Sequence, residues 1–150
     1  MKTLLPAIMF AAFLVPSLAQ AQDPSLIAVT VRFELPKCDD KDDDSSFDIA
    51  ITSGSTLIAE GKGIGRGQVF GDPSSPGPFP LILKNATTKS IFLTSITKAH
   101  LNTVRNDTVC THIVIDSLFA DNSKGSARTC NLVKISESNR DTQFANRACP

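Results

Sequence analysis

The segment VTVRFELPKCDDKDDDSSFDIAI, residues 29–51, decides the fold. Its two flanks alternate apolar and polar residues, and this period of two is typical of half-buried β-strands. The first flank is β-branched and ends at Pro36, which suits a strand that closes into a loop. Residues 39–48 between the flanks hold six aspartates. The segment therefore predicts two strands joined by a strongly acidic loop.

The acidic loop is the main candidate site. Carboxylates about 5 Å apart in water repel each other by roughly 0.8 kcal/mol per pair, so an ordered cluster needs a counter-ion. Asp40, Asp42 and Asp44 have the spacing with which a tight loop directs several oxygens at one calcium ion, and Asp48 and Asp72 could add further oxygens. The alternative is a solvated acidic loop that keeps the protein soluble.

The first residues have the features of a secretory signal peptide. Lys2 is followed by an apolar run over residues 4–15 and a small-x-small motif, which predicts a signal peptide over residues 1–21. The apolar run is too short to span a bilayer and nothing comparable follows, so no transmembrane segment is expected. Subtracting 21 residues from 150 leaves 129, which fits one secreted or periplasmic domain over residues 22–150.

The mature chain reads as short strands separated by turns. No window keeps the 3.6-residue apolar period of a helix, so little helix is expected. Seven apolar, β-branched runs between turn-forming residues predict an all-β fold, an antiparallel β-sandwich of about seven to eight strands. The predicted strands are residues 26–35, 47–52, 56–59, 79–84, 90–97, 108–119 and 127–135.

The long connections are predicted to gather at one end of this sandwich. Consecutive antiparallel strands place alternate loops at opposite ends. Residues 36–46, 61–78 and 99–107 would then share one end. Because binding groups tend to lie on loops that a rigid scaffold holds, this end is the candidate functional face.

The cysteines predict covalent cross-links. All four lie in the mature chain, and an even number in an exported protein predicts two disulfides, with three pairings open. No CxxC or CxxH spacing is present, which makes a cysteine-bound zinc ion the poorer interpretation. The predicted disulfide residues are Cys38, Cys110, Cys130 and Cys149.

Composition argues against several classes of function. Without Lys2 the chain has 14 basic and 15 acidic residues, so no positive field is expected to attract nucleic acid. The chain has no Trp and no Tyr, on which sugar-stacking surfaces depend. Catalytic motifs such as a serine-nucleophile elbow are missing, which argues against an enzyme. A hydrolase acting through His100 and His112 would need both rings to meet across a pocket.

Two tripeptides are acceptor sequons for N-glycosylation. They begin at Asn85 and Asn106. In a host that glycosylates exported proteins, both positions are expected at the surface.

Residues 29–51 resemble the calcium-binding edge of C2-like and PLAT-like sandwiches. The pieces DDKDDDSSFDIAI, FGDPSSPGPFPL and IDSLFADNS also look like a set of small exported β proteins. C2-like sandwiches draw a second aspartate pair from a later loop, where this chain offers Asn102, Asn106 and Asp107. The resemblance implies calcium at loops between strands. Its ligands would be Asp39, Asp40, Asp42, Asp44, Asp48 and Asp72.

The sequence thus predicts a secreted, non-enzymatic binding module. A calcium-stabilised acidic loop face would recognise an extracellular surface, a glycan or a protein partner. Two alternatives remain open. One is a secreted, disulfide-stabilised inhibitor or effector whose acidic loop docks on a basic partner without metal, and the other is a small hydrolase.

Overall fold

Two antiparallel sheets form the protein. The structure is a computed structural model that describes residues 22–34, 44–68, 77–103, 108–147 and 149. The first sheet has the order β4 (Phe79–Pro80), β1 (Leu26–Glu34), β7 (Thr108–Phe119) and β8 (Lys124–Arg128), and β9 (Val133–Ser136) also pairs with β7. The second sheet has the order β10 (Asp141–Ala145), β6 (Ile96–Asn102), β2 (Ser46–Ser53), β3 (Thr56–Ile64) and β5 (Ile82–Leu83). The prediction of an all-β, antiparallel fold is confirmed.

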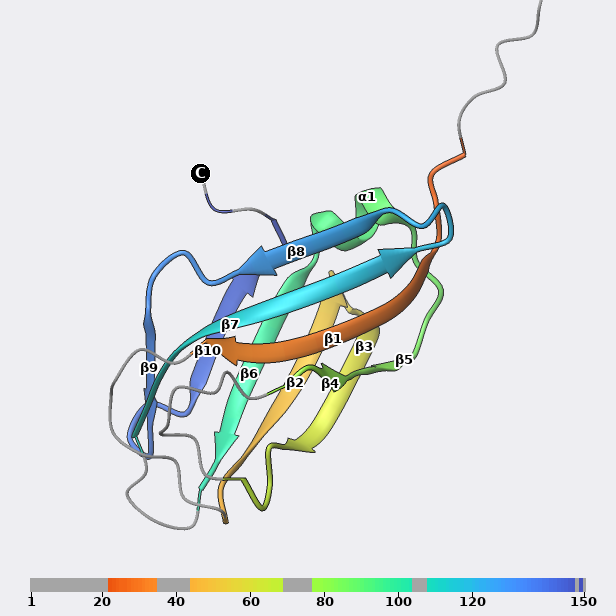
Figure 1. The fold of residues 1–150 in the computed structure, drawn as a ribbon. Coiled ribbons are helices and arrows are strands. Elements are labelled where there is room, and N and C mark those ends of the chain that lie inside the picture. The colour runs from red at the N-terminus through yellow and green to blue at the C-terminus, as the bar shows by residue number, and fades with distance from the viewer. Residues whose placement is uncertain (1–21, 35–43, 69–76, 104–107, 148, 150) are drawn as a thin grey trace, which may run out of the picture.

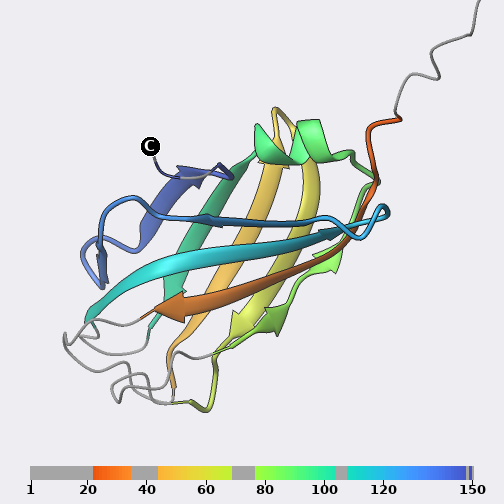
Figure 2. The same ribbon diagram turned by 45° about the horizontal axis from the view of Figure 1, so that its top comes forward.

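The core lies between the two sheets. The strands of the first sheet cross obliquely over those of the second (Figures 1 and 2). Phe33 of β1 stacks on Phe47 of β2 with ring centroids 4.7 Å apart, and both side chains are fully buried. The apolar residues that alternate along β1 and β2 therefore lie on one face of each strand, and these two faces fill a shared core as the sequence predicts.

The chain passes from one sheet to the other within residues 79–83. Pro80 pairs with Thr30 of β1, whereas Ile82 pairs with Glu60 of β3. Leu81 between them is buried in the core. The single strand predicted for residues 79–84 is thus divided between the two sheets.

The prediction of a strand over residues 90–97 is wrong for residues 90–95, and only residues 96 and 97 belong to a strand, β6. Residues Lys89–Leu93 form the short helix α1, which lies at the end of the sheets near the β7–β8 turn (Figure 1). Phe92 is buried and meets Phe119 edge-on at 6.0 Å between ring centroids. A segment of one helical turn is too short to show a 3.6-residue apolar period in the sequence. The contact of Phe92 with Phe119 therefore decides that this segment is helical. No helix in the described ranges is long and apolar enough to cross a membrane.

The C-terminal part of the chain also differs from the prediction. The strand predicted for residues 127–135 is two strands, β8 and β9, which pair with different parts of β7. Between them the chain leaves the sheet near Thr129, whose N–H donates to the carbonyl of Ile113. Strand β10 was not predicted, and β6 continues to Asn102, where a loop was expected from residue 99.

One disulfide joins Cys130 to Cys149, with 5.3 Å between the Cα atoms. Cys130 follows β8 of the first sheet and Cys149 follows β10 of the second, so the bridge connects the two sheets. No described cysteine is free. Cys38 lies outside the described residues, and a second bridge stays a prediction. Residues 1–21, with the predicted signal peptide, also lie outside them.

Candidate functional site

The strand ends that flank the three predicted loops lie at one end of the sheets. Ser46 at the start of β2 pairs with Asn102 at the end of β6. Phe47 pairs with Ile64 at the end of β3. The last residue of β1 and the first part of β7 lie at the same end (Figures 1 and 2). Residues 35–43, 69–76 and 104–107 of these loops lie outside the described residues, and they include the predicted site residues Asp39, Asp40, Asp42, Asp72, Cys38 and Asn106.

Asp44 is the described end of the acidic run. Its Oδ1 atom is shielded from solvent and has no hydrogen-bond partner among the described residues. The next two residues, Ser45 and Ser46, are buried, so the chain already lies inside the protein where β2 begins. An ionised carboxylate oxygen in such a position is costly unless a cation or donor satisfies it. A hard cation fits this atom, because carboxylate oxygens are the ligands that calcium prefers.

Asp48 lies apart from this entrance, on the outer face of the second sheet. Its Oδ1 accepts a hydrogen bond of 2.9 Å from the N–H of Gly63. His100 is its cross-strand partner on β6, and Asp141 on β10 is the partner of His100. The three side chains therefore form a row across adjacent strands.

The two histidines face away from each other. His100 lies on the outer face of the second sheet, where its Nδ1 is 2.8 Å from Oδ1 of Asp141. His112 lies on the outer face of the first sheet, where its Nδ1 is 2.9 Å from the carbonyl oxygen of Thr129. The buried core separates the two faces. The structure does not bring together the acid–base pair that a two-histidine hydrolase needs.

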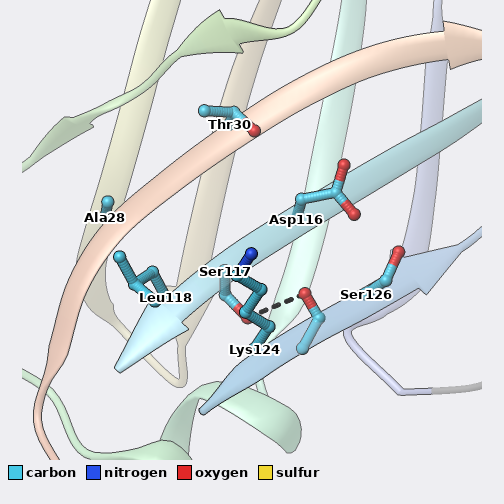
Figure 3. A pocket seen from close by; sticks show the side chains of 8 residues that line it. Ala28, Thr30, Asp116, Ser117, Leu118, Lys124 and Ser126 are labelled. Carbon is cyan, nitrogen blue, oxygen red and sulfur yellow. Dashed lines mark hydrogen bonds between the residues drawn. The ribbon is translucent and has the colours of Figure 1, made fainter. Parts of the chain in front are cut away.

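A shallow groove of about 610 Å³ follows the outer face of the first sheet. Two cross-strand rows form it (Figure 3). The first row is Thr30, Asp116 and Ser126, and the second is Ala28, Leu118 and Lys124. Sequence reasoning missed this groove because it considered loops. The signal in the sequence was the set of alternate positions in each strand, whose side chains point outward.

Ion pairs continue along this face beyond the groove. Arg32 donates to Asp116 at 2.9 Å and to Glu34 at 2.6 Å. Arg128 donates to the second oxygen of Glu34 at 3.3 Å. The hydrogen bonds to Glu34 and Asp116 raise the pKa of Arg32. These carboxylates are therefore already neutralised by guanidinium groups.

The sequon at Asn85 lies on an exposed connection after β5. The Asn85 side chain donates 2.7 Å to the carbonyl of Leu57. Thr87 is buried, and its hydroxyl oxygen has no hydrogen-bond partner in the described structure. Asn85 is exposed, and its glycosylation stays a prediction.

No protein-family model, curated protein or solved structure matches this chain. The resemblance to C2-like and PLAT-like domains thus stays a prediction that rests on residues 29–51.

Proposed function

We propose that the mature chain is a secreted β-sandwich that serves as a non-enzymatic binding module, with a calcium ion holding its acidic segment. The observation that carries this proposal is the solvent-shielded Oδ1 of Asp44, which has no hydrogen-bond partner among the described residues. A charged group left unsatisfied in this way destabilises a fold by more than the ~1–3 kcal/mol of a neutral one. A divalent cation at the acidic run would remove this cost.

The position of Asp44 supports a role in recognition. It lies at the end of the sheets where the strands flanking all three long connections end. A cation that orders the acidic segment would present these connections to an extracellular surface, glycan or protein. Ligand-binding groups are commonly built on loops of this kind.

Calcium is expected to stabilise the mature protein. At a concentration one hundred times the dissociation constant, a ligand that binds only the folded state adds about 2.7 kcal/mol to the free energy of unfolding. Thermal unfolding in calcium and in EDTA, together with calorimetric calcium titration, measures this effect. An identical melting temperature in millimolar calcium and in EDTA would overturn the proposal and favour the metal-free inhibitor or effector.

Asp44→Asn separates the ion from the general charge of the loop. In EDTA the variant is expected to be about 1 kcal/mol more stable than the wild type, because a neutral amide is cheaper to bury than an unsatisfied carboxylate. In calcium the variant is expected to lack the stabilisation that the ion gives to the wild type. Glu137→Gln is the matched control, since its side chain is 46% exposed and it removes one negative charge elsewhere. Equal calcium responses of the two variants would exclude Asp44 as a ligand.

A further inference from the structure

Strand β8 is an edge of the first sheet. In the described part of the chain it pairs with β7 alone (Figure 1). Hydrogen bonds at both ends of this pairing fix its phase, because the N–H of Phe119 donates to the carbonyl of Ser123 and the N–H of Thr129 donates to that of Ile113. Antiparallel strands exchange hydrogen bonds at alternate pairs, so every second residue of β8 directs its backbone N–H and C=O away from β7. These residues are Lys124, Ser126 and Arg128.

The outward backbone groups of β8 can pair with another strand. Among the described residues, no backbone group is hydrogen-bonded to the outward N–H and C=O of Lys124 or Ser126. The Sγ atom of Cys149 lies 3.3 Å from the carbonyl oxygen of Arg128 and covers that end of the edge. A row of unpaired N–H and C=O groups is a template for an added strand, and several peptide-binding domains recognise extended segments in this way.

The side chains along this edge are basic. Lys124 and Arg128 are exposed and four residues apart, and β8 has no acidic residue. They point to the same face of the sheet as Ser126, because side chains alternate along a strand. A strand added to β8 would therefore place two of its own side chains, also four residues apart, directly opposite these cations.

The carboxylates near β8 are already paired. Asp116 accepts a hydrogen bond from Arg32, and Glu34 accepts hydrogen bonds from Arg32 and Arg128. With Lys124, three cationic side chains meet two carboxylates on this face, a net charge of +1. Asp121 in the turn before β8 is attracted to Lys89 of α1. The ammonium group of Lys124 forms no ion pair with a described residue and thus favours an acidic partner.

A second copy of the chain does not fit this edge. Two β8 strands that pair antiparallel about Ser126 would set Lys124 of each copy opposite Arg128 of the other. Like charges directly opposite each other destabilise an antiparallel pair, and lysines at sheet edges commonly prevent such association. The cations that oppose self-pairing are the groups that attract carboxylates.

We propose that β8 binds an extended acidic segment of a protein partner by strand addition, with Lys124 and Arg128 facing two acidic residues four positions apart. Ser126 between them has a short side chain, so the middle residue of the added strand has the open groove beside it (Figure 3). This site goes beyond the calcium-dependent loop face. It uses neither Asp44 nor a metal ion.

NMR titration of the full mature protein with the end-blocked peptide Thr-Glu-Val-Thr-Val-Glu-Thr tests the proposal. The amides of Lys124, Ser126 and Arg128 are expected to shift more than those of Gly125 and Ala127, because only the first three gain hydrogen bonds to the peptide. A peptide with lysine in place of both glutamates is the control and is expected not to bind. Each titration is run in calcium and in EDTA with the same expected result, so the calcium proposal can fail without affecting this one.

Reversing one charge tests the recognition of acidic residues. Lys124→Glu is expected to weaken binding of the glutamate peptide about 10-fold, because an attractive cross-strand pair becomes a repulsive one, and to allow binding of the lysine peptide. Lys98→Glu is the matched control, since Lys98 is exposed on the outer face of the second sheet. It is expected to bind the glutamate peptide as the wild type does.

A proline substitution tests strand addition itself. Ser126→Pro removes an N–H that points away from β7 and is expected to abolish binding, whereas Ser126→Ala keeps this N–H and is expected to bind. Should Ser126→Pro fail to fold, as circular dichroism would show, the charge reversal still decides. No wild-type binding at millimolar peptide, equal binding of the two peptides, or unchanged binding in Lys124→Glu would overturn the proposal. Concentration-dependent shifts of the β8 amides without peptide would also overturn it, because a second copy would then hold the edge.

Discussion

Phe33→Ala is expected to lower the free energy of unfolding by about 4 kcal/mol, within the range for truncating a buried phenylalanine. Phe33 is fully buried and joins the sheets, because its ring stacks on Phe47 of the second sheet at 4.7 Å. It also lies 6.3 Å from the ring of Phe79. The truncation removes apolar contacts to both layers and leaves a cavity that close-packed neighbours fill only in part.

Urea unfolding followed by circular dichroism measures this loss. The denaturation midpoint is expected to fall while the slope stays constant, which marks a change in stability alone. Phe79→Ala is the control, because Phe79 is only partly buried and packs against the rim of the same cluster. A loss below about 1 kcal/mol for Phe33→Ala, or one no larger than the control, would show that this stack does not hold the sheets together.

The strands that border the core were predictable because burial on one face leaves a period-two pattern. Strand β7 was predicted with the bounds that the structure has, and the predicted strand over residues 26–35 is β1 within one residue. The same pattern was available in β6, where Ala99 and Leu101 are buried and Lys98 and His100 are not. There the turn-forming residues from 99 onward led to the prediction of a loop.

The errors occur where tertiary contacts override local pattern. Helix α1 exists because the buried Phe92 packs on Phe119, which is distant in sequence. Strand β10 is a short edge strand with no fully buried residue, so it carries little apolar signal. The split between β8 and β9 follows from their separate registers with β7. Such registers depend on pairing between distant segments, which composition does not encode.

The candidate sites show the same limit. The acidic run was evident from the sequence, and Asp44 was among its predicted ligands, but the shielding of its Oδ1 atom depends on how the chain enters β2. The row of Asp48, His100 and Asp141 was not predicted. Its members come from three strands separated along the chain, and one of these strands was unexpected. A sequence with no known register between these strands cannot reveal that they are neighbours.

Replacing Cys130 and Cys149 together by serine is expected to lower the free energy of unfolding by about 3 kcal/mol, the value for closing a loop of this length. The two residues are 19 apart in sequence. The bridge restricts the unfolded chain, and its loss makes unfolding entropically more favourable. The double variant is preferable to a single one, because a lone cysteine could exchange with the remaining thiols or disulfides.

The native position of β10 is expected to survive this change, because buried polar contacts hold the segment after it. The N–H of Asn146 donates to the carbonyl of Ser95, and its side-chain amide donates to the Ser95 hydroxyl, each at 2.9 Å. Asn146, Ser95 and Thr97 are fully buried.

Hydrogen exchange under native conditions measures where the disulfide acts. The serine pair should lower the protection of the most slowly exchanging core amides, which exchange through global unfolding. Asn146→Ala with the disulfide intact should increase the exchange of the β10 amides. If the serine pair instead exposed β10 while the core kept its protection, the bridge would act by holding an edge strand in the folded state, and the entropic account would be wrong.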